Sequence, residues 1–134
     1  MQVLLQFQLS VQSYRYGKDV SLDPTCLFCK IIEGDIPADI VFRNENVVAF
    51  NDIAPQAPTH VLIIPTLHVE NGGELAKSSP TITAELFKVA EQISNERGLS
   101  GYRTVFNTGA DAGQSVFHAH MHLLGGRALA WPPG

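Results

Sequence analysis

Three histidines occupy alternate positions in the segment HAHMH, residues 118–122. In a β-strand, side chains two residues apart point to the same face, so an extended segment would place the three imidazoles together, roughly 7 Å apart. The apolar residues between them, with Phe117 and Leu123, would then face a core. A helix would instead turn the middle histidine away from the other two. The spacing therefore predicts a strand over residues 116–124 that carries a histidine cluster on one face.

A cluster of imidazoles can perform two kinds of chemistry. It can bind zinc, because neutral imidazole is a common ligand, or it can bind an anion and supply a nucleophile. The loop just upstream, residues 109–115, contains glycines, and Asn107, Gln114 and Ser115 offer neutral donors to phosphate oxygens. Phosphate chemistry is favoured over a metal-dependent hydrolase that uses the three histidines as ligands, since no H-x-H-x-D pattern or carboxylate cluster accompanies them.

The chain contains two cysteines, Cys26 and Cys29, in a C-x-x-C pair. Their spacing is too local for the disulfide framework of a secreted protein. Buried free cysteines often serve as small apolar core residues, whereas paired thiolates bind zinc. The sequence leaves both interpretations of this pair open.

The remaining pattern indicates the elements that must position these residues. Residues 1–22 alternate apolar and polar side chains and form an extension, either an edge strand or a disordered segment, before one domain over residues 23–134. The predicted strands are 40–43, 47–50, 60–64, 103–107 and 116–124. One predicted helix runs from residue 25 or 26 to Glu33, with Asp23 or Thr25 as its cap and Gly34 at its end; the other starts at Pro80, after a Ser79 cap, and continues up to Gly98. This order predicts an α+β fold with five antiparallel strands and two helices.

Composition narrows the classes of partner. The 134 residues carry a formal net charge of −4, which disfavours a general nucleic-acid binder because phosphate contacts need a surplus of Lys and Arg. No apolar run approaches the ~18 residues of a membrane helix, and the N-terminal segment lacks the basic start of a secretory signal. We therefore expect a cytoplasmic protein that contacts neither nucleic acid nor membrane.

Several segments resemble one known family, the histidine triad (HIT) nucleotide-binding proteins. They occur in family order: DIAPQAPTH at residues 52–60, the segment 64–68, the histidines of 118–122, GGR at 125–127 and WPPG at 131–134. The last two are similar to the Hint branch in particular. The resemblance extends over residues 26–134. It implies a homodimer in which two five-stranded sheets join into a ten-stranded sheet.

The resemblance also implies an activity, the hydrolysis of purine nucleoside 5′-phosphoramidates such as AMP-lysine through a covalent nucleotidyl-histidine. His120 would be the nucleophile, with its tautomer fixed by the carbonyl of His118. His122 and His60, with the amides of Gly113 and Ser115, would stabilise the phosphate charge, and the Ser115 hydroxyl would donate to the departing amine. The alternatives are a dinucleoside polyphosphate hydrolase of another branch, or a nucleotide-binding scaffold whose catalysis is incidental.

Binding roles follow from the same resemblance. Asp52 would bind the ribose hydroxyls, since a carboxylate can accept from two O–H groups. The base pocket would be lined by Leu27, Phe28, Ile31, Phe50 and Ile53, and further nucleotide contacts would come from Asn107, Gly113, Gln114 and Trp131, the last reaching the partner subunit's site. No cofactor is expected for catalysis. Cys26, Cys29, His68 and His118 match the positions that hold a structural zinc in some bacterial members.

Overall fold

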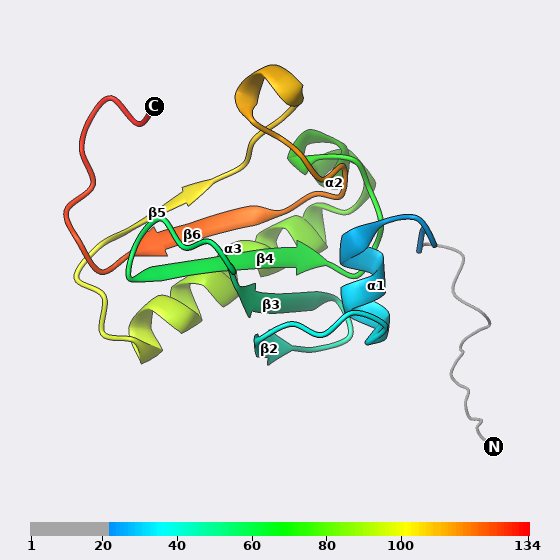
Figure 1. The fold of residues 1–134 in the computed structure, drawn as a ribbon, viewed down its shortest axis with the longest axis horizontal. Helices are drawn as coiled ribbons and strands as arrows, with labels where there is room; N and C mark the ends of the chain where they lie inside the picture. The colour runs from blue at the N-terminus through cyan, green and yellow to red at the C-terminus, as the bar shows by residue number, and fades with distance from the viewer. Residues whose placement is uncertain (1–21) are drawn as a thin grey trace.

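The computed structural model describes residues 22–134, so the predicted N-terminal extension lies outside the described residues except for Leu22. The domain is built on one antiparallel sheet of five strands in the order β2-β3-β4-β6-β5 (Figure 1). The strands are β2 (Ile40–Arg43), β3 (Val47–Asn51), β4 (Thr59–Pro65), β5 (Tyr102–Val105) and β6 (Met121–Gly125). The helices are α1 (Leu27–Glu33), α2 (Gly72–Ser78), α3 (Pro80–Glu96) and the short 3-10 helix η1 (Ala110–Ala112). The predicted fold class is confirmed.

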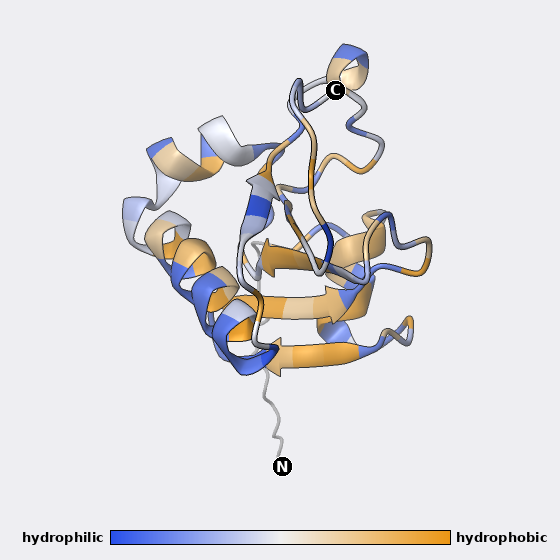
Figure 2. Ribbon diagram, turned by 90° about the vertical axis from the view of Figure 1, so that its left-hand side faces the viewer, coloured by the Kyte–Doolittle hydropathy of each residue, from blue (hydrophilic) through white to orange (hydrophobic). Residues whose placement is uncertain are grey.

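The sheet lies between two hydrophobic cores, and β3 and β4 contribute residues to both. On one face Val47, Ala49, Val61 and Ile63 pack with residues of α3, which runs across the sheet (Figure 1). On the other face the alternate residues of the same strands pack against α1, around Phe28. Figure 2 shows this pattern as hydrophobic central strands beside an α3 of mixed character.

The two predicted helices form close to the expected bounds, and their caps explain why. The Ser79 side chain accepts a hydrogen bond from the Ile82 N–H, and Pro80 occupies the first turn of α3. Gly34 ends α1 in a left-handed conformation with φ 86°, as predicted. The cap of α1 is Cys26, however, so the predicted caps Asp23 and Thr25 are wrong.

A third helix, α2, was not predicted. Asn71 caps it, and its first two residues are Gly72 and Gly73, which are poor helix formers. Tertiary contact explains Gly72, since a Cβ there would lie 2.9 Å from the Phe106 ring. Within residues 22–134, no helix has the length and apolar character needed to cross a membrane.

The histidine segment differs most from its prediction, because β6 begins at Met121 rather than at residue 116. The ladder between β4 and β6 ends at the pair Ile63 and Met121, and the Ala119 N–H donates to the Val69 carbonyl instead. Only His122 therefore lies within the strand. Phe117, predicted to face the core, is about half exposed.

Candidate active site and metal cluster

The structure brings three of the predicted catalytic histidines side by side on the α1 face of the sheet. His60 lies on β4 and His122 on the adjacent β6, with ring centroids 5.2 Å apart. His120 follows, with its ring 5.1 Å from that of His122. The Phe28 ring of α1 packs edge-on against His120 at 5.1 Å. The result is a row of imidazoles bounded on one side by an aromatic wall.

The protonation state of His120 is set by a backbone carbonyl. Nδ1 of His120 lies 2.8 Å from the carbonyl oxygen of His118, so Nδ1 carries the proton that is donated to it. Burial lowers the pKa of His120, and therefore the ring is neutral near pH 7. The second nitrogen, Nε2, then holds an unprotonated lone pair. A buried imidazole in this state is a competent nucleophile at neutral pH.

His60 and His122 form a second, linked pair. The Gln56 N–H donates to Nδ1 of His60 at 3.0 Å, so the proton of the neutral His60 ring lies on Nε2. That Nε2 lies 2.9 Å from Nδ1 of His122 and 3.4 Å from Oδ2 of Asp52. Burial, with the neighbouring His120 and His60, lowers the pKa of His122 to about 4.

A separate cluster of four side chains that could hold a metal ion includes His118, whose ring lies 5.9 Å from that of Phe28. The two C-x-x-C thiols and the imidazoles of His68 and His118 place one ligand atom each within 4.8 Å of one another. Nδ1 of His118 is 3.5 Å from Sγ of Cys26 and 3.6 Å from Sγ of Cys29. Nδ1 of His68 is 3.3 Å from Sγ of Cys29 and 3.1 Å from Nδ1 of His118.

These distances fit a tetrahedral zinc site. Zinc bonds of about 2.0 Å to nitrogen and about 2.3 Å to sulfur imply ligand separations of about 3.3 Å between nitrogens and about 3.5 Å between nitrogen and sulfur. His118 is also in the required tautomer, because its Nε2 donates to the Pro65 carbonyl at 2.9 Å and Nδ1 faces the cluster. Backbone N–H groups of Asp23 and Cys29 donate to the sulfurs of Cys29 and Cys26, which stabilises thiolates.

The carboxylate-containing group of Asp52, His60 and His122 is also compact enough to suggest a metal. Its hydrogen bonds argue against that use. A cation on Nε2 of His60 would have to displace the proton that the Gln56 N–H keeps there. The four-residue cluster is therefore the better metal site of the two.

The residues expected to line a base pocket divide into two groups. Phe28, Ile31 and Phe50 are buried in the core between α1 and the sheet. Leu27 is 44% exposed and Ile53 fully exposed, so both present apolar surface to solvent in the single chain. Asp52 follows β3, and its Oδ1 accepts from the Ala54 N–H while Oδ2 faces His60.

The loop before the histidine segment is held by Gln114. This buried side chain accepts from the Gly109 N–H and donates to the carbonyls of Glu70 and Val116, so its polar atoms serve the loop itself. Gly113 adopts φ 94°, which favours glycine. Asn107 lies beside Gly113, and the exposed Ser115 borders a cavity of about 510 Å³ next to the cysteine cluster.

Two groups that position the histidines were missed in the sequence. Gln56 acts through its backbone N–H and Pro65 through its carbonyl, so their side-chain identities give no direct signal. Pro65 offers one indirect cue: it has no N–H for the sheet, and it ends β4 where the chain turns away. Its carbonyl is then available to His118.

Comparisons with known proteins identify the family of this chain. A model of the HIT domain matches residues 33–129. Purine nucleoside phosphoramidase of Escherichia coli is 44% identical over 105 residues, which cover 77% of this chain and 88% of the relative. A 14 kDa zinc-binding protein of Zea mays is 47% identical over 116 residues, covering 84% of this chain and 90% of that protein.

One solved structure of a HIT family protein is similar to this chain in both fold and sequence. The crystal structure of a HIT family hydrolase from Legionella pneumophila has a TM-score of 0.78 and 49% identity to this chain, and covers 81% of it and 99% of its own chain. Fold and site together define a small α+β protein with a buried histidine site. The chain belongs to the HIT family.

Proposed function

We propose that this protein hydrolyses purine nucleoside 5′-phosphoramidates to a nucleoside monophosphate and an amine. Nε2 of His120 attacks the α-phosphorus and forms a bond to it while the bond from phosphorus to the amine nitrogen breaks. The departing amine nitrogen takes up a proton from solvent, and the Ser115 hydroxyl donates a hydrogen bond to it. Water then attacks the nucleotidyl-histidine, releases the monophosphate and restores the neutral imidazole.

The observation that carries this proposal is the fixed tautomer of His120. The His118 carbonyl holds the proton on Nδ1, and burial disfavours a second proton, so Nε2 is available for attack near neutral pH. The Escherichia coli phosphoramidase among the relatives supports the same reaction. His122 is near enough to His120 to donate to phosphate oxygens around the reacting phosphorus.

Nucleotide binding is proposed for the residues around this row. Asp52 lies beside His60 and suits the ribose hydroxyls, because an ionised carboxylate accepts from both. Phe28, Ile31 and Phe50, with the exposed Leu27 and Ile53, would enclose a purine by apolar contact. The amides of Gly113 and Ser115, with Asn107, would complete the phosphate site.

The test uses the purified protein with adenosine 5′-phosphoramidate and AMP-lysine, without added metal. We expect amine and AMP to be released, and His120→Ala to lose the activity, since the covalent step has no replacement nucleophile. Turnover that survives this substitution would refute the covalent mechanism. Cleavage of a diadenosine polyphosphate in the absence of phosphoramidate turnover would instead favour the dinucleoside polyphosphate hydrolase, and nucleotide binding without either activity would favour a scaffold.

A structural zinc is proposed for the cluster of Cys26, Cys29, His68 and His118, which fits the ion by donor type and spacing. When bound, zinc would supply charge that stabilises the two buried thiolates. Burial raises the pKa of Cys29 to about 12, so the thiol stays protonated without a cation. His118 would hold the metal through Nδ1 while its carbonyl orients His120, and the two roles do not compete.

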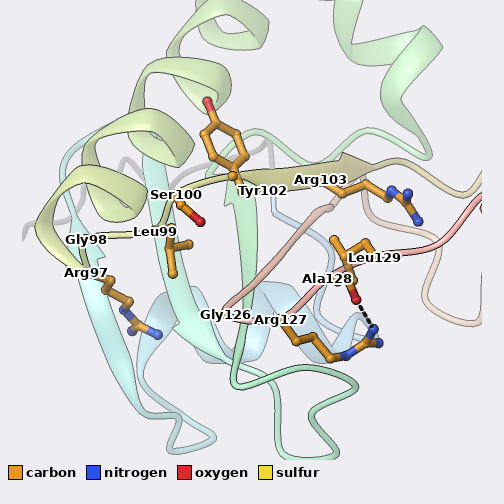
Figure 3. A pocket seen from close by; sticks show the side chains of 11 residues that line it. Arg97, Gly98, Leu99, Ser100, Tyr102, Arg103, Gly126, Arg127, Ala128 and Leu129 are labelled. Carbon is orange, nitrogen blue, oxygen red and sulfur yellow. Dashed lines mark hydrogen bonds between the residues drawn. The ribbon is translucent and has the colours of Figure 1, made fainter.

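We further propose a homodimer joined along β5. This strand lies at the sheet edge and pairs with β6 on one side only. Beyond β6, the C-terminal segment and the loop after α3 enclose a cavity of about 800 Å³ (Figure 3). Arg97, Arg103 and Arg127 line it, and within residues 22–134 no carboxylate lies within ion-pair distance of them. Trp131 lies on this C-terminal segment and is 82% exposed, so it is available to contact the partner subunit.

A further inference from the structure

We propose that His60 is a positioning residue that fixes the proton of His122 on Nε2, the nitrogen that faces the reacting phosphate. This inference rests on the proposed function for the identity of the phosphate, but the hydrogen-bond chain itself does not. The resemblance implies that His60, with His122, stabilises the charge of the phosphate. The hydrogen bonds of the structure give it a different task.

The chain of hydrogen bonds starts at the backbone. The Gln56 N–H donates to Nδ1 of His60 over 3.0 Å, and a backbone amide can only donate. Nδ1 of His60 is therefore an acceptor, and the proton of the neutral ring must be on Nε2. The backbone N–H of Gln56 thus determines which ring nitrogen of His60 carries the proton.

The tautomer of His60 in turn determines the tautomer of His122. Nε2 of His60 lies 2.9 Å from Nδ1 of His122, a good hydrogen-bond distance, whereas the Asp52 carboxylate is farther away at 3.4 Å. Because His60 donates, Nδ1 of His122 accepts. The one proton of a neutral His122 must then lie on Nε2, and that nitrogen becomes a hydrogen-bond donor.

The environment of His122 makes this control necessary. His122 is neutral near pH 7, since burial and the neighbouring imidazoles of His120 and His60 lower its pKa to about 4, against the opposing effect of Asp52. A neutral imidazole has a single proton that can occupy either nitrogen. Without the His60 donor, part of the His122 population would carry its proton on Nδ1. Nε2 of those molecules would then present a lone pair to the phosphate oxygens and could not donate a hydrogen bond to them.

The position of His60 also argues against direct contact with substrate. Its side chain is 5% exposed, and both ring nitrogens already have partners. A phosphate oxygen could reach Nε2 only by replacing His122. The arrangement therefore supports action through His122, in the way that second partners orient metal ligands and catalytic imidazoles.

Two variants separate the two ends of His60. In His60→Asn, the side-chain oxygen can take the place of Nδ1 and accept from Gln56, but the side chain is too short to donate to His122. In His60→Gln, the amide nitrogen can take the place of Nε2 and keep that donor. We expect His60→Asn to lower kcat by about 10- to 100-fold with little change in KM, and His60→Gln to recover most of the loss.

The decisive readout is the tautomer of His122, measured by 15N NMR of the imidazoles in the full chain without nucleotide. The wild type and His60→Gln should show protonated Nε2, and His60→Asn a mixture. An unchanged tautomer in His60→Asn, or equal kcat for the two variants, would overturn the proposal. If the wild type does not cleave phosphoramidates, the proposed function fails, while the NMR result still decides the role of His60.

Discussion

Removal of metal from the four-residue cluster should lower the stability of the fold without abolishing phosphoramidate turnover. The cluster joins α1, the segment after β4 and the histidine segment, which are distant in sequence. A ligand that binds only the folded state stabilises it by about 2.7 kcal/mol when its free concentration is 100 times Kd. For a domain of this size we expect the Tm to fall by roughly 10 °C when zinc is withdrawn.

The assay compares metal content, thermal unfolding and phosphoramidate turnover before and after treatment with a chelator, and again after zinc is restored. His68→Ala should lower zinc content and Tm, because His68 belongs to the cluster and not to the row of His60, His122 and His120. Glu70→Ala is the matched control, since its exposed carboxylate lies two residues away and outside the cluster.

Two results would refute the reasoning about the cluster. One is a protein that contains no zinc after expression with zinc and whose Tm does not respond to added zinc. The other is immediate loss of turnover on chelation at unchanged Tm and at temperatures well below it, which would assign the metal to chemistry. Retained turnover with a lower Tm supports a structural ion.

The other predictions concern pH and assembly. The folded-state pKa of His122 lies near 4, below its unfolded value of about 6.5, so the unfolded state binds the extra proton between these values. Its contribution to stability is complete above pH 6.5 and is lost as the pH falls towards 4, at no more than about 1.4 kcal/mol per pH unit. Denaturant unfolding at pH 7, 6 and 5 should show a shallower pH dependence for His122→Gln than for the wild type, and equal slopes would contradict this assignment. If the proposed dimer joins along β5, Val105→Asp should give a monomer in light scattering with size exclusion, because a buried charge at a joined edge is costly. Lys88→Asp, on the exposed side of α3, is the control and should leave the mass unchanged. A dimeric mass for Val105→Asp would place the interface elsewhere.

Local signals explain which parts of the fold were predictable. The predicted strands 40–43 and 47–50 form β2 and β3, and the turn between them is local, since the Asn44 side chain accepts from the N–H groups of Asn46 and Val47. The start of α3 was also predictable from adjacent residues, the Ser79 cap and Pro80 in the first turn. Helix α2 has a local cap at Asn71, but Gly72 and Gly73 in its first turn disfavour a helix, and it depends on packing against α3 and Phe106.

The site was less predictable because its partners are distant or belong to the backbone. Cys29 and His118 are separated by 89 residues, and no spacing rule links them without the family resemblance. Gln56 orients His60 through its backbone N–H, which any residue except proline would supply, and Pro65 orients His118 through its carbonyl, which any residue would supply. The residue types of the site could therefore be found in the sequence, but not the hydrogen bonds that assign each proton.

The departure of residues 116–120 from the predicted strand is what makes the histidines usable. In a continuous antiparallel ladder, backbone carbonyls are paired with neighbouring N–H groups across the sheet. Here β6 starts at Met121, so the His118 carbonyl is available to His120 and the Pro65 carbonyl to His118. The same break lets His118 turn its Nδ1 towards Cys26 and Cys29 while His122 remains on the sheet beside His60. A regular strand would have placed three equivalent imidazoles on one face. The irregular segment instead gives His118 and His120 different backbone carbonyls as partners, while His122 is partnered by the His60 side chain, so the proton positions of the three rings differ.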